Sequence, residues 1–541
     1  MRTMKMKNTI SIPRLLPVAM MALVVMFATT AYGATPGITG TGTVATFNLT
    51  AQTAFLNQPD GAAVYSWGYG CATGSAPTFL PAAITTATCP TMQVPGPTLI
   101  VSQGQAVTVT LTNGLPTSAG NTSILFPGFQ VAATGGVTGL LTQEAQPGGT
   151  AVTYKFTAST PGTHAYYSGT QSDLQIEMGL YGAIVVLPSA TPLNCTAGGA
   201  QSEGKAFAGA NGVAEAHWAE SDFRLASAAY NHARTCYDRE YLFQWAEMDA
   251  NIHRAALAQV TAKGSCAAGA VGCSLEVPTE PYQPSYFVIN GRSMPDVMDA
   301  NYGVEYPHQP YNSNPHMHPG EQVLIRTVGQ GRWQHPFHEH GNHVRILARD
   351  GNLILSATDP NSLAGLLMFN TDTTPGQAFD GIFYWTGRGL NWDPYAHNPA
   401  STDALAKLPC TPDANGYNTG APTAINYYEW CQDHNKPLEV APIGDVAGSG
   451  PATLPSPNIL TNGAWYGGTP YLGPNAVVRS TGPTSNLQPS NVQANPGNER
   501  GFAFMWHSHN EREITTNNVF PGGMLMMMLV DSREFVIDEA N

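Results

Sequence analysis

Residues 98–112 read Thr-Leu-Ile-Val-Ser-Gln-Gly-Gln-Ala-Val-Thr-Val-Thr-Leu-Thr, which is two short runs on either side of a glycine-containing turn. The second run alternates apolar and polar residues, and β-branched residues are frequent in both. This pattern is typical of β-strands with one buried face. Similar runs recur at short intervals between residues 44 and 188, a stretch that has the length of one β-sandwich. The pattern therefore predicts an all-β fold.

A second series of such runs begins at residue 241 and ends at residue 530. It predicts a second sandwich, interrupted by a long loop-rich insertion at about residues 388–500, which are rich in Pro, Gly and Asn. We therefore expect one sandwich domain at residues 34–190 and another at residues 236–541. The Ala-rich residues 191–235 are expected to form a linker with helical turns.

The N-terminal residues resemble a secretion signal. Four basic residues within the first 14 positions precede the apolar run at residues 15–30, and small residues follow at positions 31–33. This order predicts a signal peptide at residues 1–33, cleaved after Gly33. The apolar run is short for a membrane span, and no later stretch is long and apolar enough for one. We expect a chain exported to the periplasm or the extracellular space, with no membrane span after signal removal.

The charge of the chain limits its partners. The sequence has 23 Lys and Arg against 37 Asp and Glu, a formal net charge of −14. Removal of the basic signal would make the chain more negative still. Such a charge disfavours nucleic acid and anionic membranes as partners and is compatible with cations. Only 11% of residues are charged, whereas there are 56 Gly and 42 Pro, which suits many short strands joined by turns.

All eight cysteines follow the predicted signal, and none lies in a CxxC motif. In an exported chain this favours structural disulfides over metal ligands. Sequence alone does not determine the connectivity. The order along the chain suggests four local pairs, which are Cys71 with Cys89, Cys195 with Cys236, Cys266 with Cys273, and Cys410 with Cys431.

Two His-x-His pairs are the main candidates for a binding site. His338 and His340 lie within His-Pro-Phe-His-Glu-His-Gly, and His507 and His509 lie within Trp-His-Ser-His. Side chains two residues apart on a strand point to the same face, so each pair forms a two-pronged clamp. Neutral imidazole is a common ligand of copper and zinc. Two such clamps on neighbouring strands predict a four-histidine metal site.

A third pair, His316 and His318, is a weaker candidate. It lies in the His-rich segment between His308 and His343, but next to Pro and Gly, where histidines at the surface are common.

The chain resembles multicopper oxidases. The resemblance rests on ordered landmarks between Asn121 and Ser189, on residues 335–341, which are similar to the family's HPxHxHG motif, and on residues 506–524, which are similar to its C-terminal HCH…GM motif. It implies two cupredoxin-like Greek-key β-sandwich domains, copper cofactors and oxidoreductase chemistry. The order of strand sets and motifs is closer to that of two-domain family members than to that of three-domain members. This similarity implies a homotrimer.

The sequence departs from the family in its first domain. The resemblance implies that this domain should supply four of the eight histidines of an oxygen-reducing copper cluster. Those positions are Leu125, Pro127, Tyr167 and Gly169 in this chain.

The position of the family's type 1 copper, which accepts electrons from substrates, is also altered. His335 remains, but the cysteine position is Ser508, the second histidine position is Glu513, and the candidate methionine, Met524, comes about six residues late. A serine hydroxyl cannot replace a thiolate in a blue copper site. We therefore expect no blue centre and no normal four-copper laccase. His335, Glu513 and Met524 remain candidate metal ligands.

Three hypotheses follow. The leading one is an exported copper-binding protein that holds one or two copper ions at the four histidines, with zinc or manganese as alternatives, and has at most reduced oxidoreductase activity. The second is an active copper-dependent oxidase of phenols or metal ions. The third is a metal-free structural or interaction protein. The sequence leaves open whether the chain is an enzyme.

Overall fold

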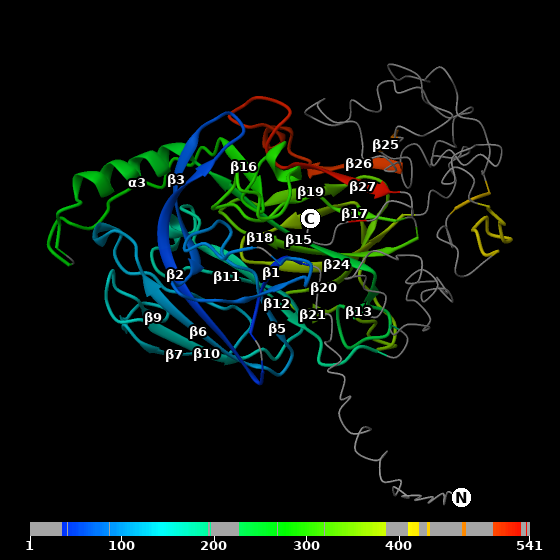
Figure 1. The fold of residues 1–541 in the computed structure, drawn as a ribbon, viewed down its shortest axis with the longest axis horizontal. Coiled ribbons are helices and arrows are strands. Elements are labelled where there is room, and N and C mark those ends of the chain that lie inside the picture. Colours follow the sequence, from blue (N-terminus) through cyan, green and yellow to red (C-terminus); the bar gives the residue numbers. More distant parts are fainter. Residues whose placement is uncertain are drawn as a thin grey trace, which may run out of the picture. The chain divides into compact units, whose positions relative to one another are not determined.

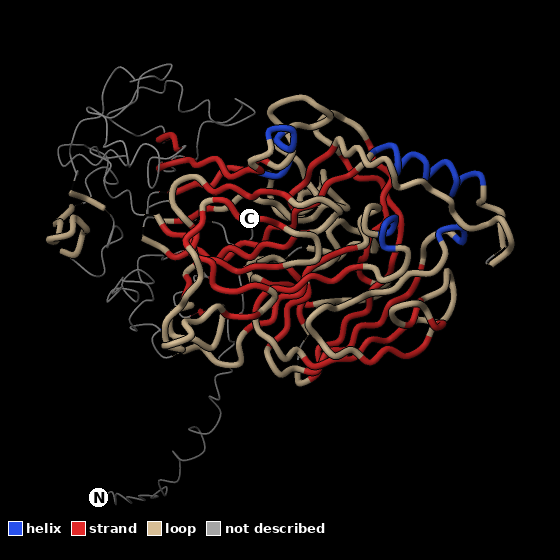
Figure 2. The backbone as a smooth tube through the Cα atoms, turned by 180° about the vertical axis from the view of Figure 1, so that it is seen from behind, coloured by secondary structure: helices blue, strands red, loops and turns tan. Residues whose placement is uncertain are grey.

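The computed structural model describes residues 35–40, 42–85, 87–192, 195, 227–267, 269–318, 320–385, 409–420, 430–432, 468–471, 501–531 and 537. Strands dominate these residues, as the red segments of Figure 2 show. The predicted signal peptide and most of the predicted linker and insertion lie outside the described residues. No helix among the described residues is long and apolar enough to cross a membrane.

The first part of the chain forms two five-stranded sheets (Figure 1). One sheet has, in spatial order, β11 (Gly162–Tyr167), β12 (Tyr181–Leu187), β5 (Leu99–Ser102), β1 (Gly37–Thr39) and β4 (Thr78–Leu80). The other has β3 (Ala63–Cys71), β2 (Val44–Asn57), β6 (Ala106–Asn113), β10 (Val152–Thr157) and β7 (Ala132–Gly135). A two-stranded hairpin, β8 (Val137–Thr138) and β9 (Gln143–Glu144), and the short helices η1 (Thr117–Ala119) and α1 (Ser172–Gln175) complete this part.

Residues 98–112 show how these two sheets pack against each other. In β6 the alternating Val107, Val109 and Leu111 are buried, while the Thr residues between them are more exposed. Leu99 and Val101 of β5 belong to the same core from the facing sheet. The strands before and after the turn at Gly104 thus lie in different sheets, and they form a sandwich rather than a hairpin.

The second part of the chain forms two further sheets. The first contains β16 (Tyr286–Ile289), β15 (Arg239–Met248), β18 (Gln322–Gly329), β24 (Ala378–Tyr384), β20 (Val344–Arg349) and β21 (Asn352–Leu353), with β22 (Leu367–Met368) also paired to β20. The second contains β17 (His316–Met317), β27 (Leu525–Asp531), β26 (Gly501–Ser508), β19 (His335–Glu339) and β23 (Asn370–Thr373), with β25 (Gly468–Tyr471) also paired to β26. The remaining elements are the pair β13 (Ser227–Ala228) and β14 (Cys236–Tyr237), and the short helices η3 (Asp296–Met298) and η5 (Glu511–Ile514).

Parallel neighbours in all four sheets reflect long crossover connections of the Greek-key type. Strand β2 runs parallel to β6, β12 to β5, β15 to β18, and β17 to β27. The all-β fold of two sandwiches is therefore confirmed. The domain boundaries stay a prediction, since the residues around them are largely outside the described part.

Helix α3 (Ala250–Ala262) links the two parts and was not predicted. The Asp249 side chain caps it by accepting a hydrogen bond from the Asn251 nitrogen. The helix follows β15 in the chain, yet its buried Ile252 and Ala256 join the core of the first sandwich. Apolar residues on one helical face make this possible, but only the tertiary structure identifies the surface they cover.

The four suggested disulfides are all present, as Cys71–Cys89, Cys195–Cys236, Cys266–Cys273 and Cys410–Cys431.

Candidate metal centre

Two adjacent strands bring the predicted histidines together. Strands β19 and β26 are antiparallel neighbours in one sheet (Figure 1). Within this pair, His338 lies directly opposite His507. Directly opposed residues of antiparallel strands have their side chains on the same face. The strand period of two then adds His340 to that face.

The imidazole rings form a close cluster. The ring centre of His338 lies 4.8 Å from that of His340 and 5.3 Å from that of His507. One ring nitrogen from each of these three residues can be chosen such that the nitrogens all lie within 4.8 Å of one another. The structure thus brings both predicted His-x-His pairs to one place.

His509 lies at the open side of the cluster. Its ring centre is 4.7 Å from that of His338 and 5.6 Å from that of His507. The His509 side chain is 50% exposed, whereas His338 is 1% exposed. Solvent therefore reaches the cluster beside His509.

Burial keeps the imidazoles of His338 and His507 neutral. Burial first, and then the neighbouring rings of His507 and His509, lower the pKa of His338 to about 4. Burial likewise lowers the pKa of His507. A neutral imidazole retains a lone pair on one ring nitrogen, which is the form that binds a metal ion.

Neighbouring groups fix the orientation of these rings. His507 Nδ1 lies 2.6 Å from the Ser508 carbonyl oxygen, so its Nε2 faces the cluster. The indole nitrogen of Trp506 donates to the His340 carbonyl oxygen at 2.9 Å. Phe369 stands edge to face with His338, with ring centres 5.8 Å apart. Contacts of this kind hold ligand side chains in place around protein metal sites.

The spacing of the nitrogens fits a copper or zinc ion. Metal–imidazole distances of about 2.0–2.1 Å place two nitrogens of a tetrahedral site roughly 3.3 Å apart. His340 Nε2 and His507 Nε2 are 3.1 Å apart. Two nitrogens at this distance either share a proton or face a common ion.

The three residues at the family's type 1 position also meet, but as a hydrogen-bonded group. His335 Nδ1 lies 2.8 Å from Glu513 Oε2, and the Ser508 hydroxyl donates to the same oxygen at 2.5 Å. The buried Met524 joins them through its backbone, which donates to the Glu513 carbonyl oxygen.

A second carboxylate completes this group. His335 Nε2 lies 2.8 Å from Glu247 Oε2, and His335 is fully buried. Burial alone lowers the pKa of His335, but the hydrogen bonds and charges of Glu247 and Glu513 outweigh it and raise this pKa to about 9. His335 is therefore protonated at neutral pH, and both of its ring nitrogens donate to carboxylates.

Sequence reasoning missed Glu247, which lies on β15, far from the histidine motifs in the chain. The sequence contained one indication of its role. Glu247 is a charged residue in the largely apolar run Leu-Phe-Gln-Trp-Ala-Glu-Met at residues 242–248, and buried charges are rare without a partner. Glu247 Oε1 accepts a hydrogen bond from the Tyr282 hydroxyl. The same hydroxyl also contacts Glu177, which belongs to the first part of the chain.

His316 and His318 lie elsewhere in the sheet. They are in or next to β17, which is separated from β26 by β27. His316 Nδ1 is 2.6 Å from Asp531 Oδ2, and His318 Nδ1 is 3.4 Å from the Asp531 carbonyl oxygen. The structure does not bring this pair to the histidine cluster.

Three of the four first-domain positions that lack histidine, Leu125, Tyr167 and Gly169, adjoin one another. Leu125 and Tyr167 form a β-bridge, and Leu125 would lie 2.8 Å from a Cβ atom added at Gly169. These residues offer no metal ligand among their side chains, apart from a phenol.

Comparisons with known proteins agree with these motifs. Residues 79–191 match the family model of a multicopper oxidase domain. A segment of 99 residues is 36% identical to laccase abr2 of Aspergillus fumigatus, and it represents 18% of this chain and 16% of that laccase. This chain therefore aligns with only a small part of its curated relative.

Two solved structures are similar over most of the chain. Multicopper oxidase mgLAC has a TM-score of 0.43 at 15% identity, with 90% of this chain and 86% of that chain covered. The blue copper oxidase from Nitrosomonas europaea has a TM-score of 0.43 at 14% identity, with 90% and 85% covered. In sequence, residues 79–191 are the part of this chain that resembles a known family, and they match a multicopper oxidase domain.

Proposed function

We propose that this chain is an exported copper-binding protein whose ion is held by His338, His340, His507 and His509. The observation that carries the proposal is that ring nitrogens of His338, His340 and His507 lie within 4.8 Å of one another. The buried imidazoles of His338, His340 and His507 at two neighbouring strands form a pre-organised ligand set. Copper is preferred over zinc and manganese because imidazole ligands bind it more tightly.

The chain's own residues would supply binding and access. The three inner histidines are buried, and the Ser508 carbonyl oxygen and the Phe369 ring contact the rings of His507 and His338. His509 adds a fourth nitrogen at the solvent-exposed side. A bound copper ion would supply one-electron redox chemistry. Stable binding of one ion is proposed, and a second ion would need ligands beyond these four.

Redox activity through this site would be at most reduced. Normal family members pass electrons from a type 1 copper to the cluster through the cysteine between two histidine ligands. Here Ser508 occupies the cysteine position, and the charged His335 forms hydrogen bonds to Glu513 and Glu247 on both of its sides. A substrate electron would therefore have to enter at the four-histidine site itself.

A slow copper-dependent oxidase is the second candidate function. The exposure of the His509 side chain favours it, because a small phenol or a metal ion from solvent can approach the cluster there. Measured turnover with such substrates in copper-loaded protein, lost together with copper in the histidine variants, would identify this function.

Copper stoichiometry in variants tests the proposed site. The double substitution His338→Ala with His507→Ala removes two inner ligands and should reduce bound copper from about one ion per chain to none. His343→Ala is the matched control, since His343 is close in the sequence and contacts Phe369 but is outside the cluster. Unchanged stoichiometry in the double variant, or equal loss in the control, would contradict the assignment.

A further inference from the structure

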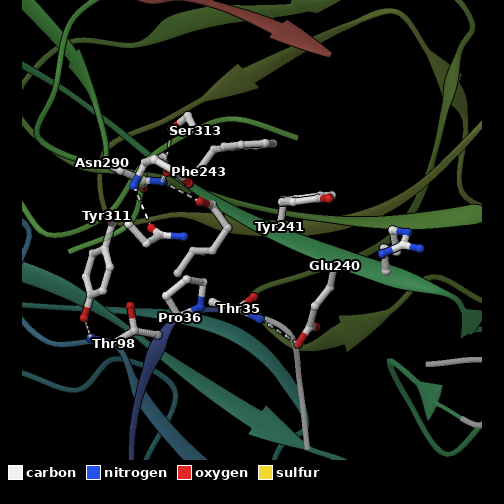
Figure 3. Close-up of a pocket in the computed structure, with 13 residues that line it drawn as sticks. Thr35, Pro36, Thr98, Glu240, Tyr241, Phe243, Asn290, Tyr311 and Ser313 are labelled. Atoms are coloured by element: carbon white, nitrogen blue, oxygen red, sulfur yellow. Dashed lines mark hydrogen bonds between the residues drawn. The ribbon is translucent and has the colours of Figure 1, made fainter. Parts of the chain in front are cut away.

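A small cavity lies where the two sandwiches meet. It measures about 30 Å³ for the centre of a water-sized sphere, and its lining includes Thr98 of the first part of the chain and Phe243 and Asn290 of the second (Figure 3). One water molecule needs roughly 10–15 Å³ by this measure. The cavity therefore has room for a few water molecules and not for an organic substrate.

Phe369 contacts the histidine cluster from outside the ligand set. It lies between β22 and β23, which belong to different sheets of the second sandwich. Its ring stands at 86° to that of His338, with ring centres 5.8 Å apart. It also stands at 86° to the ring of His343, with ring centres 5.2 Å apart. One phenyl ring thus touches a proposed copper ligand and a histidine outside the cluster.

The backbone holds Phe369 beside the strand that carries the ligands. The nitrogen of Glu339, which lies between His338 and His340 on β19, donates to the Phe369 carbonyl oxygen at 3.1 Å. The next residue, Asn370, lies directly opposite His338 in the pairing of β23 with β19. The position of Phe369 relative to the ligands is therefore set by backbone contacts with β19.

The Phe369 side chain is not part of the apolar core. It is 47% exposed. Among the described residues, the core of the second sandwich includes Phe337 and packs against Met368, but it does not include Phe369. The aromatic contacts of Phe369 in this part of the chain are those with the two imidazoles. Loss of its ring should therefore affect the metal centre more than the stability of the sandwich.

We propose that Phe369 is a positioning residue of the copper site, which holds the His338 ring in its ligand orientation and covers one side of that ring. The inference rests on the copper-binding function proposed above. An edge-to-face contact restricts the rotation of the rings that form it. Apolar groups next to metal ligands also limit the access of solvent, and in this way they affect metal affinity and redox potential.

Removal of the ring should change the metal centre without removing a ligand. In Phe369→Ala the His338 imidazole gains rotational freedom, so copper affinity should fall about tenfold or more, as is usual when a supporting contact of a metal ligand is lost. Water would reach the side of His338 that the ring covers. Since polar surroundings favour the more highly charged Cu(II), the reduction potential should also fall. The stoichiometry should stay at about one ion per chain.

Copper binding by matched variants tests the proposal. Leu367→Ala is the control, because Leu367 is an apolar residue two positions before Phe369 and is 56% exposed. Competition with a copper chelator should show the loss of affinity in Phe369→Ala and not in Leu367→Ala. The Cu(II) EPR spectrum should change, and the potential should fall, in Phe369→Ala alone. Phe369→Tyr keeps the aromatic ring and should return all three properties to those of the unmodified protein.

The outcomes distinguish this inference from the proposed function. If the unmodified protein binds copper, but Phe369→Ala matches Leu367→Ala in affinity, EPR spectrum and potential, the role of Phe369 is overturned and the copper site stands. If the unmodified protein binds no copper, both are overturned. Should Phe369→Ala not fold, Phe369→Leu keeps an apolar side chain without the ring. Unchanged copper affinity in Phe369→Leu would contradict positioning by the aromatic contact.

Discussion

His335 Nδ1 lies 2.8 Å from Glu513 Oε2, and the Ser508 hydroxyl donates to the same carboxylate oxygen. By the sequence resemblance, these three positions are the ones expected to carry the histidine, histidine and cysteine ligands of a type 1 copper. The positions still converge, but a protonated imidazole between Glu513 and Glu247 now supplies the positive charge.

Stability should fall at alkaline pH because of this imidazolium. The pKa of His335 is about 9 in the folded chain, above the value of about 6.5 for an unfolded histidine. The resulting stabilisation is fully present below pH 6.5 and is lost as pH rises through 9. The expected loss is on the order of 3 kcal/mol in the free energy of unfolding. Denaturant unfolding at a series of pH values measures it.

The substitution His335→Gln is the control for this pH dependence. It removes the titrating group, so the variant should be less stable at neutral pH and show a flatter profile between pH 6.5 and 9. Parallel profiles for the two proteins would mean that His335 is not an imidazolium in the folded state.

A blue copper centre should be recoverable. Ser508→Cys together with Glu513→His places a thiolate and a second imidazole beside His335 Nδ1, where these side chains already meet. The Cu(II)–thiolate bond should give an intense visible band after copper loading. The visible spectrum of the double variant, compared with each single variant, measures this. A colourless double variant that still binds copper at the four histidines would show that the ligand positions no longer converge as described.

The four histidines should contribute unequally to metal affinity. His340 is 8% exposed and its Nε2 lies 3.1 Å from that of His507, whereas the His509 side chain is 50% exposed. His340→Ala should therefore weaken copper binding by about tenfold or more relative to His509→Ala, a difference of about 1.4 kcal/mol. Competition titrations with a copper chelator would measure both. Equal losses would argue against a site centred on the buried rings.

The disulfides should differ in their effect on stability. Cys71–Cys89 joins residues 18 apart, with Cys71 buried on β3, whereas Cys266–Cys273 closes a loop of only 7 in an exposed segment. Disulfides are worth about 2–4 kcal/mol and stabilise more when they close longer loops. Cys71→Ser with Cys89→Ser should thus lower Tm more than Cys266→Ser with Cys273→Ser. The opposite order in thermal unfolding would contradict this reading.

Local patterns were enough to predict most of the fold. The alternation in residues 106–112 identified β6, and the two His-x-His pairs identified the strands that bear the cluster. These patterns can be recognised in the sequence because they involve only residues a few positions apart. Helix α3 was missed because its apolar face covers a core built by distant strands. Glu247 was missed because its importance comes from His335, which lies far along the chain.

The measurement that tests the central claim most directly is elemental analysis of the exported, copper-loaded protein together with its visible and EPR spectra. The account predicts about one copper ion per chain, a Cu(II) EPR signal with nitrogen ligands and no intense blue band. Protein that retains no copper after loading, or that shows an intense blue band, would contradict it.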